Sequence, residues 1–172
     1  MPALKGSKTE ENLKTAFAGE SQANQKYLAY AEKAARDGFP VVAKLFRAVA
    51  AAEAIHARNH LKALEGVKST IENLTDAQGG EDYEITEMYP PMIAQAESEG
   101  DKKAVRSMHF ALEVEKVHYE LYGMAIAAVT DGKDLSEAKA RVCPICGHTV
   151  IGDAPDKCPV CGCAGERYLE IA

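Results

Sequence analysis

Two short motifs in this chain of 172 residues place a glutamate and a histidine three positions apart. One joins Glu53 to His56, and the other joins Glu115 to His118. On a helix, residues three apart lie about 60° apart around the axis and one turn along it, so both side chains can reach one metal ion. Oxygen-rich ligands with imidazole suit iron or manganese. The two motifs therefore indicate that two helices carry ligands to metal.

Three further glutamates interrupt the apolar faces of the other predicted helices: Glu20 in the first, and Glu84 and Glu87 in the third. An isolated buried carboxylate is costly, so acids at such positions favour a metal site. A four-helix bundle can hold a di-iron centre with two E-x-x-H helices and a glutamate from each of the others. The predicted ligands are Glu20, Glu53, His56, Glu84, Glu87, Glu115 and His118. His60 is interpreted as an exposed histidine.

The cysteines form a second candidate metal site, because all five lie between residues 143 and 163. Cys143 and Cys146, and then Cys158 and Cys161, form two C-P-x-C-G knuckles. Four thiolates in two knuckles predict a tetrahedral site, which fits iron or zinc. Cys163 is left over and is interpreted as a bystander thiol.

Helical spacing predicts the elements that position these ligands. A capping box, Ser7-x-x-Glu10, opens a first helix that runs to about residue 36, and a second spans 41–64. The polar stretch 67–81 is predicted as a loop, and a third helix at 82–99 should kink at Pro90-Pro91, next to Glu87. A fourth helix spans 102–129. The chain is therefore predicted to be mainly α, with a four-helix bundle at 1–132, a linker at 133–140 and a small cysteine-rich domain at 141–172.

Charge and hydropathy narrow the functional classes. The formal net charge is −6 and no long Lys/Arg block is present, which argues against nucleic acid or an anionic membrane as the main partner. The N-terminus lacks a secretory apolar core, and no apolar run approaches ~18 residues. We expect a soluble, cytoplasmic protein. In a reducing cytosol, paired cysteines are better interpreted as metal ligands than as disulfides.

The whole pattern resembles the rubrerythrin family, including the segments Thr15–Ala23 and Thr86–Pro90. The resemblance implies a ferritin-like bundle with a non-haem di-iron centre and a rubredoxin-like, zinc-ribbon-like β domain with one iron on Cys143, Cys146, Cys158 and Cys161. It implies that Glu53 and Glu115 bridge the two irons. Glu20 would bind one iron, and Glu84 and His118 the other.

The resemblance also implies a ligand exchange and a supporting residue. On oxidation, one iron would replace His56 by Glu87, a direction that fits the preference of ferric iron for anionic oxygen. Tyr27, two turns beyond Glu20, is a candidate hydrogen-bond donor to the ligands.

The activity implied by the resemblance is a peroxidase that reduces hydrogen peroxide to water and protects against oxidative stress. Two ferrous ions can each give one electron, so peroxide receives two. The cysteine-bound iron would return electrons singly, supplied by a separate reductase that draws on reduced nicotinamide, NAD(P)H. A linker of about ten residues spans at most ~33 Å, so the cysteine-rich domain can lie far from the di-iron centre of its own bundle. From the family we also expect a homodimer in which the tail of one subunit serves the di-iron site of its neighbour.

Three other functions fit parts of the pattern. A ferritin-type ferroxidase or storage protein shares the bundle, but it predicts shell assembly and a mineral core. An oxygen-activating hydroxylase would need a lined substrate pocket. A redox-silent zinc ribbon would make the protein a binding module, and it would be colourless where ferric thiolate is red.

Overall fold

The computed structural model describes residues 4–172. The expectation that the N-terminus lacks a secretory apolar core rests partly on the first three residues, which lie outside this range. The chain forms two compact units, one ending at Lys68 and the other beginning at Ser69. Long helices dominate both, and a small sheet lies near the C-terminus, which confirms the predicted mainly α class. Within residues 4–172, no helix combines the length and apolarity needed to cross a membrane.

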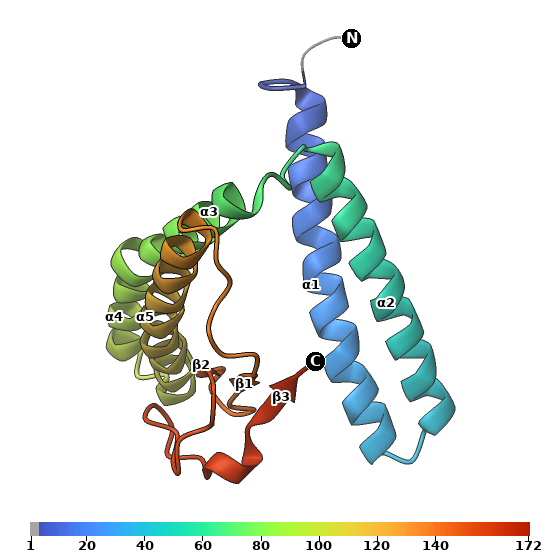
Figure 1. The fold of residues 1–172 in the computed structure, drawn as a ribbon. Helices are drawn as coiled ribbons and strands as arrows, with labels where there is room; N and C mark the ends of the chain where they lie inside the picture. The colour runs from blue at the N-terminus through green and yellow to red at the C-terminus, as the bar shows by residue number, and fades with distance from the viewer. Residues whose placement is uncertain (1–3) are drawn as a thin grey trace. The chain divides into compact units, whose positions relative to one another are not determined.

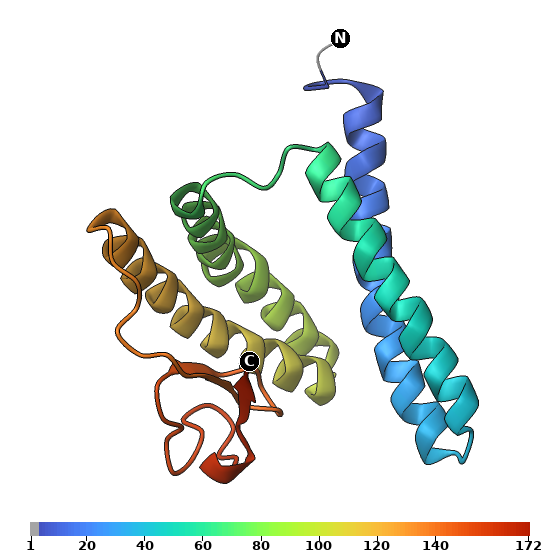
Figure 2. The same cartoon turned by 45° about the vertical axis from the view of Figure 1, so that its right-hand side comes forward.

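The first unit is a helical hairpin of α1 (Lys8–Arg36) and α2 (Pro40–Ala63), which lie side by side in Figures 1 and 2. The Ser7 hydroxyl accepts a hydrogen bond from the Glu10 backbone N–H at 3.1 Å, which is one half of the predicted capping box. The Glu10 carboxylate accepts from the Gly6 N–H rather than from that of Ser7. The buried residues of α2 are alanines seven positions apart, at 43, 50 and 57. Small side chains on one face let the two helices pack closely.

The second unit contains α3 (Thr70–Tyr83), a π-helical turn η1 (Glu84–Met88), α4 (Tyr89–Glu99) and α5 (Lys102–Thr130). The first three form one irregular helical stretch that packs along α5 (Figure 2). Asp101 caps α5 by accepting hydrogen bonds from the backbone N–H groups of Lys103 and Ala104, at 3.0 and 3.1 Å. Gly100 makes the preceding turn with φ +75°, a conformation that favours glycine.

The predicted loop at 67–81 is wrong, because α3 begins at Thr70. Ser69 and Glu72 form a capping box that starts the helix. Ile71 and Leu74 are partly buried along this helix. Two glycines in the helix, Gly79 and Gly80, each cost about 1 kcal/mol relative to alanine, but burial of the apolar side chains and the cap outweigh that cost.

The predicted irregularity at Pro90-Pro91 is confirmed, and its form is a π turn. The backbone N–H of Tyr89 bonds the Glu84 carbonyl five residues back. Each proline lacks the N–H that would continue the α-helical ladder, so the wider turn accommodates the break before α4 resumes.

The cysteine-rich module follows an irregular segment at 131–139. Its three-stranded antiparallel sheet has the order β2-β1-β3, with β1 at Ala140–Val142, β2 at Thr149–Ile151 and β3 at Leu169–Ile171. A 3-10 turn η2, Gly165–Arg167, precedes β3. The module belongs to the same compact unit as α3–α5. The division at 133–140 remains a prediction.

Candidate metal centres

The hairpin α1–α2 brings three of the predicted ligands together. Glu53 and His56 lie one turn apart on α2, and His56 Nδ1 is 2.8 Å from Glu53 Oε2. Glu20 on α1 faces them, with its Oε1 3.9 Å from the same nitrogen. One ligand atom from each residue lies within 4.8 Å of the others, so one cation could contact all three.

The second unit repeats this arrangement on α3 and α5. His118 Nδ1 is 2.7 Å from Glu115 Oε2 and 4.0 Å from Glu81 Oε1. The three ligand atoms again lie within 4.8 Å of one another. Each helix pair therefore holds a matched triad of two carboxylates and one imidazole.

Glu81 is the ligand candidate that sequence reasoning missed. The predicted loop included Glu81, and the predicted third helix began at residue 82. The first acid predicted as a ligand there was therefore Glu84, one turn later. Glu84 lies close enough for its charge to interact with those of Glu115 and His118, while the side chain of Glu87 is exposed. Glu87 lies six residues after Glu81, which is about 240° around a regular α-helix, so the two do not share a face. The π turn that begins at Glu84 changes the angular spacing further. The roles predicted for Glu84 and Glu87 remain predictions.

Each carboxylate near the second triad disfavours the ionised form of its neighbours. Burial raises the pKa of Glu81 to about 7, helped by the nearby Glu115 carboxylate and opposed by His118. Burial and Glu115 also raise the pKa of Glu84. Carboxylates arranged in this way are stabilised when a cation binds between them. The electrostatics therefore fit a cation site.

Two tyrosines lie near the triads. Burial and the charges of Glu84, Glu115 and Glu81 raise the pKa of Tyr89, so its hydroxyl stays protonated and can donate hydrogen bonds. Sequence reasoning did not assign it a role. The Tyr27 ring packs against Tyr30 and Phe46, with ring centroids 6.2 Å apart in both pairs. Its predicted hydrogen bond to a ligand remains a prediction.

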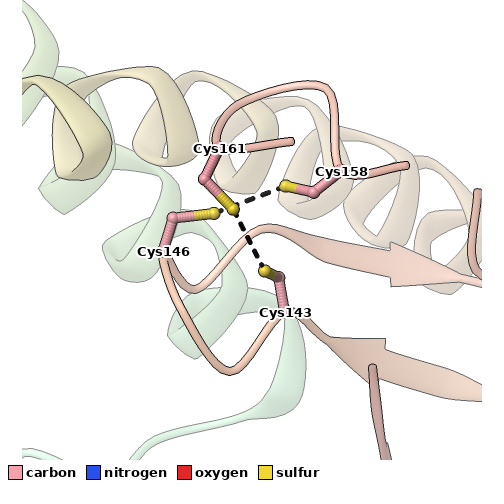
Figure 3. A group of neighbouring side chains, drawn as sticks. All are labelled: Cys143, Cys146, Cys158 and Cys161. Carbon is pink, nitrogen blue, oxygen red and sulfur yellow. Dashed lines mark hydrogen bonds between the residues drawn. The ribbon is translucent and has the colours of Figure 1, made fainter. Parts of the chain in front are cut away.

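Four cysteines from the two knuckles point toward one centre (Figure 3). The Sγ atoms of Cys143 and Cys161 are 3.5 Å apart, as are those of Cys146 and Cys158. A tetrahedral ion with metal–sulfur bonds of ~2.3 Å would place sulfurs about 3.8 Å apart. A disulfide would bring them to about 2.05 Å. The spacing fits a four-thiolate metal site, and Cys163 lies outside this group, as predicted.

The two knuckles have the same backbone construction. The Gly147 N–H donates to the Cys143 carbonyl at 3.0 Å, and the Gly162 N–H donates to the Cys158 carbonyl at 2.9 Å. Both glycines have positive φ, at +87° and +74°. This conformation lets each loop turn tightly and direct its backbone N–H groups at sulfur.

Hydrogen bonds prepare the first cysteine of each knuckle for metal. Burial raises the pKa of Cys158, but the Tyr168 hydroxyl and two backbone N–H groups outweigh burial and lower the pKa to about 6. Backbone N–H groups likewise outweigh burial at Cys143 and lower its pKa. Burial raises the pKa of Cys146 and Cys161. Metal binding needs thiolates, so the lowered pair favours it.

Two buried residues, Tyr168 and His148, form a hydrogen-bonded pair next to Cys158. The Tyr168 hydroxyl lies 3.0 Å from His148 Nδ1. Burial lowers the pKa of His148, so the ring is neutral and its single N–H can donate to the tyrosine oxygen. The hydroxyl proton then remains available for the sulfur. No sequence signal marked this pair, because it depends on residues 20 positions apart.

The cysteine-rich module also contacts the second triad of its own chain. Thr149 Oγ1, at the start of β2, lies 2.9 Å from His118 Nε2. Gly147 packs near the Val114 side chain, which is 2% exposed. We expected the tail to serve a neighbouring subunit, whereas this contact joins it to α5 of the same chain.

Known proteins resemble the chain along nearly its full length. A family model described as Rubrerythrin matches residues 11–126. The chain is 34% identical to rubrerythrin-2 of Clostridium acetobutylicum, covering 96% of this chain and 98% of that protein. It is 38% identical to nigerythrin of Nitratidesulfovibrio vulgaris, covering 89% and 81%. The structure of fully reduced, all-ferrous nigerythrin matches with a TM-score of 0.58 at 35% identity, covering 97% of this chain and 91% of that chain.

The donor sets fit the two kinds of iron site that these relatives indicate. Carboxylate oxygens with imidazole nitrogens suit iron, and four thiolates at tetrahedral spacing suit iron or zinc. Each triad therefore has the donor chemistry of a carboxylate–histidine iron site, and the four cysteines have that of a rubredoxin-like site.

Proposed function

Because this chain belongs to the rubrerythrin family, we propose that it reduces hydrogen peroxide to water, with electrons delivered through the four-cysteine site. The observation that carries the proposal is the pair of matched triads, joined in one chain to a redox-capable thiolate site. Reduction of one peroxide consumes two electrons and two protons and yields two waters. When bound, a pair of ferrous ions supplies those two electrons.

The carboxylates and imidazoles of the two triads would supply the ligands of that ion pair. We assign Glu53 and Glu115 as the bridging carboxylates, as the family resemblance implies. Glu20 and Glu81 would be the outer carboxylates of the two halves, because each completes a triad within 4.8 Å. His56 and His118 would supply one neutral nitrogen each. The four carboxylates together would balance the charge of two ferrous ions.

The residue that replaces His56 on oxidation is assigned to Glu84. Sequence reasoning placed the outer ligand at Glu84 and the exchanging carboxylate one turn later, at Glu87. The triad of Glu81, Glu115 and His118 supports Glu81 as the outer ligand, and the same one-turn step then leads to Glu84.

Electrons would come one at a time from a separate NAD(P)H-linked reductase. The four-cysteine site would accept each electron and pass it on, because its thiolates hold the metal in one geometry through both oxidation states. A homodimer is part of the proposal, supported by the family resemblance.

The proposal is tested by stopped-flow oxidation of the fully reduced protein with hydrogen peroxide and, separately, with dioxygen. We expect faster oxidation by peroxide, with one peroxide consumed per two electrons. Faster oxidation by dioxygen, or no reaction with peroxide, would displace the peroxidase proposal. Accumulation of many irons per chain as a mineral would instead support a ferritin-type ferroxidase.

A further inference from the structure

The two ring nitrogens of His118 face different partners. Nδ1 lies 2.7 Å from Glu115 Oε2 and 4.0 Å from Glu81 Oε1, so it faces the carboxylates. Nε2 lies 2.9 Å from Thr149 Oγ1. A ring nitrogen that binds a metal carries no proton, so with a metal on Nδ1 the proton of the His118 ring lies on Nε2. Nε2 therefore donates a hydrogen bond to the Thr149 hydroxyl.

The Thr149 hydroxyl passes this hydrogen bond on. Its single proton points to the Gly147 carbonyl oxygen, 3.0 Å away. Gly147 directly follows Cys146, one of the four thiolate ligands. With a metal on Nδ1, the donors and acceptors are consistent from Nε2 to the Gly147 carbonyl, since the hydroxyl accepts once and donates once. A continuous path of two hydrogen bonds and a short stretch of backbone thus connects the imidazole of one site with a cysteine of the other.

One side of this path is apolar. A cavity of roughly 310 Å³ adjoins the His118–Thr149 pair, and Leu74, Leu121 and Ile151 contribute to its lining. A hydrogen bond in such a setting is electrostatically stronger than one in water. Gly147 lies near the Val114 side chain, and β2 contacts α5. Contacts between the module and α5 therefore also help to keep Thr149 near His118.

We propose that Thr149 is a positioning residue that fixes the His118 ring with Nδ1 free for metal and couples the four-cysteine site to the triad of its own chain. The kinetic consequence of this inference rests on the proposed function. The orientation of the His118 ring does not rest on it.

The first experiment observes the His118 N–H directly. Exchangeable imidazole N–H protons of histidines bound to ferrous iron give strongly shifted proton resonances. In the reduced, iron-loaded protein we expect one such resonance to exchange slowly with solvent. Thr149→Val should make it exchange at least about tenfold faster, and Thr149→Ser should restore it. The matched control is Thr130→Val, which removes a hydroxyl that bonds the Ile126 carbonyl on α5, away from both sites.

The second experiment measures coupling in a single turnover. After peroxide oxidises the reduced protein, the return of red absorption reports reoxidation of the cysteine-bound iron. We expect Thr149→Val to slow this phase at least tenfold, Thr149→Ser to restore it, and Thr130→Val to leave it unchanged. Unaltered reoxidation in Thr149→Val overturns the coupling, and an unaltered N–H resonance overturns the positioning. If the wild type itself ignores peroxide, the proposed function fails while the resonance still decides the role of Thr149.

A mixed assembly tests whether the coupling stays within one chain. One chain carries Glu115→Ala, which disables the α5 triad, and the other carries Cys158→Ser, which disables the thiolate site. Coupling through Thr149 predicts no recovery of turnover when the two are combined, because each intact site lies beside a disabled partner. Recovered turnover would show that the tail serves a neighbouring subunit and would overturn the own-chain path.

Discussion

The side-chain amide of Gln78 on α3 donates a hydrogen bond to the main-chain carbonyl of Tyr119 on α5, 3.1 Å away. Asn24 makes the equivalent bond in the first unit, from α1 to the Ala50 carbonyl on α2 at 2.7 Å. Gln78 lies one turn before Glu81, and Asn24 lies one turn after Glu20. Each helix pair therefore has a polar clamp beside its triad, which sets the register of the two helices and aligns the ligands.

Gly123 makes room for the clamp in the second unit, because a Cβ there would lie 2.9 Å from Gln78 Nε2. Gly123→Ala should gain about 1 kcal/mol from helix propensity but lose about 0.5–1.5 kcal/mol of hydrogen bonding. The free energy of unfolding of the metal-free chain should therefore change little. In a Gln78→Ala background the same substitution should stabilise by about 1 kcal/mol. Equal effects in both backgrounds, measured by urea denaturation, would contradict this coupling.

Glu81 should be the metal ligand of α3. Glu81→Gln keeps the shape of the side chain but removes its charge, so we expect loss of iron from the di-iron site while the red chromophore remains. Asp82→Asn is the matched control, since Asp82 is exposed on the same helix. Iron content and visible absorption measure both outcomes. Iron loss on Glu87→Gln with full retention in Glu81→Gln would restore the ligand register predicted from the sequence.

The same carboxyl should make the metal-free chain less stable as pH rises. Burial raises the pKa of Glu81 from 4.5 to about 7, so the folded chain holds this proton more tightly than the unfolded chain. The resulting stabilisation is complete below about pH 4.5 and is lost as pH rises through about 7. Unfolding curves of metal-free Glu81→Gln should show less of this decline. An equal decline in the variant would rule out Glu81 as its source.

The two metal sites should be lost independently. Glu53→Ala or Glu115→Ala each removes a carboxylate from a triad, so the di-iron centre should be lost while ferric thiolate absorption persists. Cys158→Ser should abolish that absorption and leave the di-iron centre in place. Iron counting and visible spectra test both directions. Loss of both sites from either kind of substitution would mean that they do not fold as separate sites.

Tyr168→Phe should weaken metal binding by the cysteines in mild acid. The substitution removes the hydroxyl that helps to lower the pKa of Cys158 to about 6, so that pKa should rise. Protons then compete better with metal. In a zinc-loaded protein titrated with acid, we expect half of the cysteine-bound zinc to be released at a higher pH than in the wild type. Release at an unchanged or lower pH would exclude the hydroxyl as a stabiliser of the thiolate.

The sequence alone determined the features that depend on spacing along the chain. The bounds of α1, α2 and α5 were predictable because apolar periodicity, capping residues and glycine or proline stops act within a few residues. The pairing of Glu53 with His56 and of Glu115 with His118 follows from one helical turn. The cysteine knuckles were recognisable for the same local reason.

Only the tertiary structure decided which residues meet across elements. Glu81 joins Glu115 and His118 because α3 begins earlier than its polar sequence indicates and packs along α5. The contact between Thr149 and His118 spans 31 positions and depends on how β2 packs against α5. Long-range packing of this kind leaves no periodic trace in one sequence, since the free energy that selects it comes from burial between elements rather than from either element alone.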